Sequence, residues 1–175
     1  MTDNKEKKAV KQKKKNSKLI YEISDYADKI RVFSLDETVS DITDSFIPEK
    51  YKGDTFGTVL VRLIAEKGIY QSSLSKMTGI SETAIARYIN GSLTPKLNRT
   101  VAICIALRLS YQESKYLMDL NNICINSITE ENLLYTCFLL SCMFDKNITV
   151  MSCNEILEKH GYEPLTGLRR FSKKY

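Results

Sequence analysis

The sequence predicts an all-α protein: a five-helix domain preceded by one helix and followed by a helical extension. Along most of the chain, apolar residues recur at intervals of three and four, the spacing of one face of an α-helix. Only 3 Pro and 7 Gly occur among 175 residues, which is few for the many turns of a β-sheet protein. The hydrophobic content of 43% is sufficient for a buried core. A bundle of short helices is therefore the expected architecture.

Charge divides the chain into four segments. Residues 1–18 carry eight basic and two acidic side chains, and residues 19–53 carry four and eight. Residues 54–120 carry eight and five, and residues 121–175 carry six of each. The net charge of +5 and the pI near 8.9 therefore come mostly from the first segment. A basic excess of this size suits a nucleic-acid partner but does not identify one.

The first two segments predict a tail, a helix and a linker. Residues 1–18 lack apolar periodicity and repeat like charge, so we expect disorder in isolation. This tail has two open interpretations, an arm that contacts DNA phosphates or a solubilising segment. Apolar residues at helical spacing predict an amphipathic helix over 19–31, which needs a surface to pack on, either this chain or a partner subunit. Residues 32–53 are acidic and predict a linker with at most a short helix.

The cysteines and the apolar pattern indicate where the protein resides. Five cysteines occur, at positions 104, 124, 137, 142 and 153, and no two form a CxxC pair. Several lie among Leu, Ile and Phe, as free cysteines do when they act as small buried hydrophobes. The pattern argues against disulfides or a zinc site and favours a reducing compartment. Without a signal peptide or a membrane-length apolar stretch, we expect a cytoplasmic protein with no membrane partner.

Residues 54–120 predict five helices. The first ends at Gly68, a suitable residue just past a helix C-terminus. The second covers 71–78, and the third runs from an N-cap at Ser81 to about residue 90. The residues expected to face the core are Phe56, Leu60, Leu63, Ile64, Leu74, Ile80, Ile85, Tyr88, Val101, Ile103, Ile105, Ala106, Leu107, Tyr116, Leu117 and Leu120.

The connections between these helices are also visible in the sequence. Gly79 allows the left-handed backbone of a tight turn between the second and third helices. Pro95 leads into the fourth helix, and Ser110 with Glu113 makes a capping box that opens the fifth. Two helices joined by a turn of this kind form the helix-turn-helix pattern.

The stretch QSSLSKMTGISETAIARYINGSLTP, residues 71–95, resembles the Cro/repressor-type helix-turn-helix family, also called lambda-repressor-like or xenobiotic-response-element type. Ser75 stands where this family usually has Ala, and Ile89 where Glu is frequent. The resemblance extends over residues 54–120 and implies the five-helix fold of the family. The matching positions are Gln71, Leu74, Ser75, Gly79, Ile80, Ser81, Ile85, Asn90, Gly91 and Pro95.

The resemblance also implies which side chains contact base edges. In this family the third helix, here 81–90, enters the major groove with its N-terminal residues at the bases. Arg87 matches a position that can bind guanine bidentately, and Thr83 one that can pack on a thymine methyl. Glu82 would accept from a cytosine amino group or reject other sequences, and Ala84 is small enough for close approach. Outside such a motif, these residue types would be ordinary solvated side chains.

Contacts to the sugar-phosphate backbone are expected around the same two helices. Gln71 starts the second helix, where its side chain and the helix amides can hold a phosphate. The other expected contacts lie at the start of the third helix and in the loop that follows it. The full set is Gln71, Ser81, Asn90, Ser92, Lys96 and Arg99.

Residues 121–175 predict a helical extension. Thr129 caps a helix over 130–144 that is apolar nearly all round, which predicts burial on several sides. Thr149 caps another helix, which ends at Gly161. The basic end from Pro164 to Tyr175 is expected to fray. Either a dimerisation element or an extra layer on one chain's core fits this segment.

Taken with the resemblance, these patterns predict a DNA-binding transcriptional regulator, a repressor that binds double-stranded DNA as a homodimer. No catalytic motif is present, and His160, the single histidine, belongs to none, so neither an enzyme nor a cofactor is expected. The resemblance implies a bacterial or phage origin and association with the nucleoid. The alternative is a protein-interaction module with this fold, such as an antitoxin, whose C-terminal helices bind a protein partner.

Overall fold

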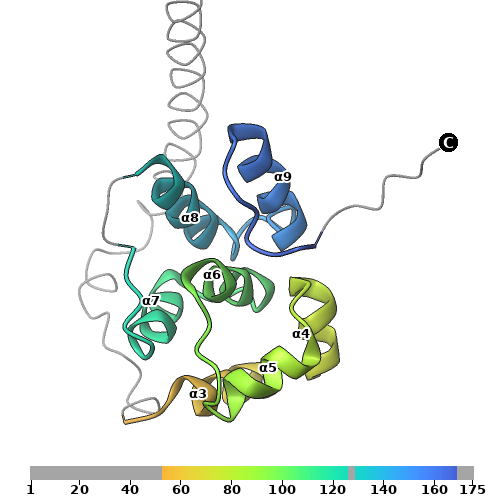
Figure 1. The fold of residues 1–175 in the computed structure, drawn as a ribbon, viewed down its shortest axis with the longest axis vertical. Coiled ribbons are helices and arrows are strands. Elements are labelled where there is room, and N and C mark those ends of the chain that lie inside the picture. The colour runs from red at the N-terminus through yellow and green to blue at the C-terminus, as the bar shows by residue number, and fades with distance from the viewer. Residues whose placement is uncertain (1–52, 126–128, 169–175) are drawn as a thin grey trace, which may run out of the picture. The chain divides into compact units, whose positions relative to one another are not determined.

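Seven α-helices and no β-strand make up residues 53–125 and 129–168, the ranges that the computed structural model describes (Figure 1). The predicted all-α class is confirmed. The helices are α3 Phe56–Glu66, α4 Gln71–Thr78, α5 Glu82–Ile89, α6 Leu97–Ala106, α7 Tyr111–Asp119, α8 Glu130–Ser141 and α9 Val150–His160. The predicted tail 1–18, the helix 19–31, the linker 32–53 except its last residue, and residues 169–175 of the predicted basic end lie outside the described residues.

The turn between α4 and α5 has the predicted form. Gly79 ends α4 with a left-handed φ of 70°, and its N–H donates to the Ser75 carbonyl at 2.8 Å. Ile80 is fully buried beside the turn. Ser81 then caps α5, because its Oγ accepts from the Ala84 N–H at 3.3 Å. The short connection therefore fixes where α5 starts relative to the end of α4.

Helix α6 is the central helix of the described region. It packs on α4, α7, α8 and α9, and every residue from Thr100 to Ala106 is buried. Almost all of the residues predicted to face the core are buried, from Phe56 to Leu117. Leu120 is the exception, because it lies half-exposed after the end of α7. The predicted capping box of Ser110 and Glu113 is present.

The C-terminal helices form a layer against the preceding domain. Helix α8 packs on α6 and α7, and α9 packs on α4 and α6. Thr129 and Thr149 cap them as predicted, and Gly161 ends α9 with a left-handed φ of 83°. The described part of the extension therefore packs as an additional layer on its own chain, and its role in dimerisation stays a prediction.

The prediction that 130–144 is buried on several sides is wrong in part. The helix ends at Ser141, and Leu133 on its outer face is 39% exposed. Met143 and Phe144 follow the helix and are 48% and 66% exposed. Among the described residues α8 packs on α6, α7 and α9, while Leu133 faces outward.

The prediction that the chain frays from Pro164 is also wrong for its first residues. Leu165 and Thr166 are buried, and Asn154 of α9 holds this segment through three hydrogen bonds. Frayed ends lack such partners, whereas a buried Asn that satisfies backbone groups fixes the chain locally. The C-terminal segment up to Leu168 is therefore part of the folded layer.

Arg108 joins the layer to the preceding domain. Its guanidinium donates to the carbonyls of Cys142, Asp145 and Lys146 at 2.5, 2.7 and 2.8 Å. These carbonyls lie at and just beyond the C-terminus of α8, where helix geometry leaves oxygens without helical partners. Arg108 itself adopts a left-handed φ of 55°, directly after Leu107, the C-cap residue of α6.

Candidate nucleic-acid interface

Helix α5 presents one face to the core and the other to solvent. Ile85 is fully buried and Tyr88 is 5% exposed, and both lie on the side where the helix packs on α3 and α4. Glu82, Thr83 and Arg87 are exposed. Thr83 and Arg87 are four residues apart, so they share one face of the helix. Ala84 is half-buried at the edge of this face.

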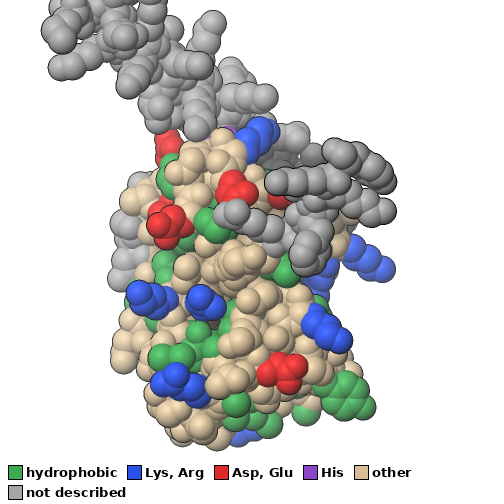
Figure 2. Space-filling model, turned by 45° about the vertical axis from the view of Figure 1, so that its right-hand side comes forward, with side chains coloured by type: hydrophobic (Ala, Val, Ile, Leu, Met, Phe, Trp, Pro, Cys, Tyr) green, Lys and Arg blue, Asp and Glu red, His purple; other side chains and the backbone are tan. Residues whose placement is uncertain are grey.

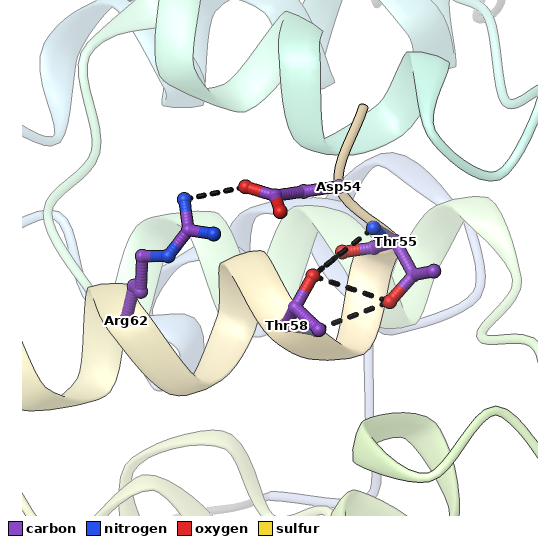
Figure 3. A network of polar contacts seen from close by, with 4 residues as sticks. All are labelled: Asp54, Thr55, Thr58 and Arg62. Carbon is purple, nitrogen blue, oxygen red and sulfur yellow. Dashed lines mark hydrogen bonds and ion pairs between the residues drawn. The ribbon is translucent and has the colours of Figure 1, made fainter. Parts of the chain in front are cut away.

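Helix α3 supports α5 from the core side. Its start is fixed by a capping box in which the Thr55 N–H donates to Thr58 Oγ1 at 3.0 Å, and the Thr58 N–H donates to Thr55 Oγ1 at 3.3 Å (Figure 3). Asp54 adds an ion pair with Arg62. Gly57, inside the first turn, lies against the C-terminus of α5, where a Cβ atom would meet the Ile89 carbonyl oxygen.

The N-termini of α4 and α5 are tied together by one side chain. Gln71 Nε2 donates to the Glu82 carbonyl at 2.9 Å, so the first residues of the two helices are neighbours. Tyr70, the N-cap residue of α4, makes no side-chain cap and is 79% exposed. The amides of the first turn of α4 are therefore without a side-chain cap beside the first residue of α5, an arrangement suited to an anion.

The loop after α5 carries the remaining predicted contacts. Asn90 Oδ1 accepts from the Ser92 N–H at 2.9 Å, which shapes the loop before the buried Pro95. Asn90, Ser92 and Lys96 are exposed, whereas Arg99 is half-buried in the first turn of α6. The structure thus places Gln71 and Ser81 at the neighbouring starts of α4 and α5, Asn90 and Ser92 just after α5, and Lys96 and Arg99 at the start of α6.

The charge on this part of the molecule is mixed. Figure 2 shows Lys and Arg side chains at several separate positions, with Asp and Glu side chains between them. The basic residues on α5 and at the start of α6 are Arg87, Lys96 and Arg99, and the acidic residue on α5 is Glu82. Glu82 lies in the first turn of α5, where the helix dipole favours a negative charge. The basic residues would favour phosphates around α5, while Glu82 opposes nonselective contact at its tip.

Residues 59–113 match the family model of the Cro/C1-type HTH DNA-binding domain. The match begins in α3, contains α4, the turn and α5, and ends in the first turn of α7. Residues 59–113 are therefore similar to a Cro/C1-type helix-turn-helix domain. At the level of this family, the match supports a DNA-binding transcription regulator. Comparisons with curated proteins and with solved structures gave no match.

The helix-turn-helix domain contains contacts that sequence reasoning missed. The sequence did not predict the bond from Gln71 to the Glu82 carbonyl, because the two residues lie eleven positions apart on different helices. No pattern in the sequence predicts that Tyr70, beside the start of α4, is exposed. In ranges 53–125 and 129–168, no cluster of His, Cys, Asp and Glu suits a metal ion. No helix in those ranges has the length and apolar character for spanning a membrane.

Proposed function

We propose that this protein recognises a specific operator sequence in double-stranded DNA with α5 and represses transcription there. The observation that carries the proposal is the outer face of α5. Glu82, Thr83 and Arg87 are exposed on it, while Ile85 and Tyr88 anchor the opposite side in the core. A helix held from one side can enter the major groove, which admits one helix, with its free side at the base edges.

Each outward residue has chemistry that suits a base edge. Arg87 has the planar donors for a bidentate bond to guanine, and the Thr83 methyl fits against the methyl of thymine. Glu82 accepts from a cytosine amino group, and it also repels phosphates from the tip of the helix. Ala84 is small enough for the backbone of α5 to approach the DNA closely. Each well-formed contact of this kind discriminates by about 1–3 kcal/mol against the wrong base.

Phosphate contacts at both ends of α5 would hold the helix in register. Gln71 and the uncapped amides of α4 suit one phosphate, and Ser81 lies close by at the start of α5. The second place is the loop after α5 and the start of α6. Its candidates are Asn90, Ser92, Lys96 and Arg99. Contacts of this kind position the protein without reading sequence.

The proposed working form is a homodimer on two half-sites about one helical turn apart. Bound there, it would occlude RNA polymerase, and this mechanism uses no cofactor and no catalytic residue. The alternative, an antitoxin-like interaction module, needs a segment available to mask a partner protein. The described part of the extension packs on the DNA-binding domain up to Leu168, which favours the DNA-binding proposal over that alternative.

The test is selection from a random double-stranded DNA library, read by sequencing, at two salt concentrations. Wild type should enrich a two-fold symmetric motif, and Arg87→Ala should relax the preference at one base pair of each half-site. Lys115→Ala is the matched control, because it removes an exposed positive charge from α7 and leaves α5 unchanged.

The proposal fails if salt-sensitive binding selects no motif and Arg87→Ala behaves as the wild type does. In that case the basic tail 1–18 would account for the binding, and the protein-interaction alternative would lead. Enrichment of a motif without two-fold symmetry would retain direct recognition by α5 and exclude the dimer.

A further inference from the structure

A segment outside the helix-turn-helix domain contacts the turn between its two helices. Thr166 Oγ1 donates to the carbonyl of Thr78 at 2.5 Å, across 88 positions of sequence. Thr78 is the last residue of α4, and its oxygen is one of the carbonyls that a helix leaves without a partner at its C-terminus. Thr166 and Thr78 are both buried, so no solvent replaces this bond.

Asn154 holds Thr166 in place. Its Nδ2 donates to the carbonyls of Thr166 and Leu168 at 3.1 and 2.8 Å, and its Oδ1 accepts from the Leu165 N–H at 2.8 Å. Asn154 is only 2% exposed and comes from the middle of α9. All three bonds go to backbone groups of 165–168. Helix α9 therefore fixes the conformation of this segment.

The same segment packs on the turn residue itself. A Cβ atom on Gly79 would lie 2.8 Å from Leu168 Cβ and 3.1 Å from the Leu168 nitrogen, so Leu168 occupies the space that glycine leaves. Inside the turn, the Ile80 N–H donates to Thr78 Oγ1 at 3.2 Å, and Ser81 follows as the cap of α5. The contacts thus form an unbroken path from Asn154 through Thr166 and the turn to the first residue of α5.

We propose that Thr166 and Asn154 are positioning residues for DNA recognition, and that the C-terminal extension sets the direction in which α5 leaves the turn. This inference rests on the proposed function, because it assigns a role in base recognition by α5. Recognition needs side chains held within about 0.5 Å of their productive positions, and the turn is the hinge that determines where α5 begins. The hydroxyl of Thr166 fixes the last residue before that hinge.

The experiment compares three full-length variants with the wild type. Thr166→Val keeps the shape of the side chain and removes the hydroxyl, whereas Thr166→Ser keeps the hydroxyl. Thr136→Val is the matched control, because Thr136 in α8 donates to the Asn132 carbonyl at 2.9 Å within its own helix. Each variant is measured for affinity to the motif that the wild type selects and to an unrelated duplex at the same salt, with helix content and unfolding temperature recorded.

Thr166→Val should bind the selected motif about tenfold more weakly, because a coupling free energy between two sites typically changes affinity by a factor of about this size. Its affinity for the unrelated duplex should stay unchanged. Thr166→Ser should restore specific binding, and Thr136→Val should match the wild type. A purely stabilising role would lower the unfolding temperature without changing the ratio of the two affinities. If folded Thr166→Val keeps the wild-type ratio, the inference is wrong while the proposed function stands.

Hydrogen exchange in the wild type provides the test if Thr166→Val does not fold. Binding of the selected motif should slow exchange of the Leu165 amide, which is buried and donates to Asn154, together with the amides of α5. Slowing in α5 with an unchanged rate at Leu165 would overturn the inference. If the wild type selects no motif, the proposed function fails first and this inference fails with it.

Discussion

Gly57→Ala tests how closely α3 and α5 approach. A Cβ atom at this position would lie 1.9 Å from the carbonyl oxygen of Ile89 and 2.7 Å from its carbonyl carbon. Both are backbone atoms, so a side-chain rotation cannot relieve the overlap. To reach ordinary contact, the oxygen has to retreat from 1.9 Å to at least 3.4 Å, which moves the end of α5.

Two opposing contributions set the size of the effect. Alanine is better than glycine inside a helix by about 1 kcal/mol, because it loses less backbone entropy. Overfilling a packed contact costs about 1–3 kcal/mol, and the upper end applies here because the opposing atoms are backbone. The net expectation is a loss of about 2 kcal/mol in the free energy of unfolding. At a typical dependence on urea, this loss lowers the urea midpoint by about 1 M.

The assay is urea unfolding of the full chain followed by circular dichroism. Gly167→Ala is the control, because a Cβ atom there meets nothing within 4 Å and Gly167 does not have a positive φ. It should change the free energy of unfolding by less than about 0.5 kcal/mol. If Gly57→Ala is as stable as the wild type or more stable, the packing of α3 on α5 is looser than argued, and the reasoning is refuted.

Four further expectations follow. Arg108→Ala removes three bonds to carbonyls and should lower the free energy of unfolding by about 2 kcal/mol in urea, with a smaller loss for Arg108→Lys. Lys96→Ala should weaken binding to every duplex and reduce the slope of log affinity against log salt by about 1. If the tail contacts phosphates, deletion of residues 1–18 should reduce the slope of log affinity against log salt by more than Lys96→Ala does. If the tail only solubilises the protein, the deletion should leave this slope unchanged. Burial raises the pKa of the Cys104 thiol from 9.0 to about 12, so the stability present below pH 9.0 should fall as the pH rises towards 12. Urea unfolding across that range should show this fall, with a smaller slope for Cys104→Ala.

The helix ends could be predicted because their causes are local in sequence. Gln71–Thr78 was predicted and found, and Ser81, Thr129 and Thr149 cap helices as expected. A capping hydroxyl reaches an amide three residues away, so its partner lies within the same short stretch. The exposed face of α5 follows in the same way from the burial of Ile85 and Tyr88.

What could not be predicted depends on contacts between distant parts of the chain. Nothing near Thr166 in the sequence shows that its hydroxyl meets Thr78, and nothing near Arg108 points to the carbonyls after α8. The apolar composition of α8 suggested burial on several sides, but α6 takes the central place and leaves Leu133 facing outward. The amino-acid composition of a helix shows how much apolar surface it has, but it does not show which helix the others surround.

The arrangement of the layers would let the extension act on the proposed DNA recognition by α5 without covering the exposed face of that helix. Helix α5 packs on α3 and α4, while α8 and α9 pack on α6, α7 and α4 (Figure 1). Helix α4 is therefore the element that α5 and α9 share, and its last residue, Thr78, is where the extension reaches it. A partner or modification that displaced residues 165–168 would act on α5 through the turn after α4 and leave the Glu82, Thr83 and Arg87 face free.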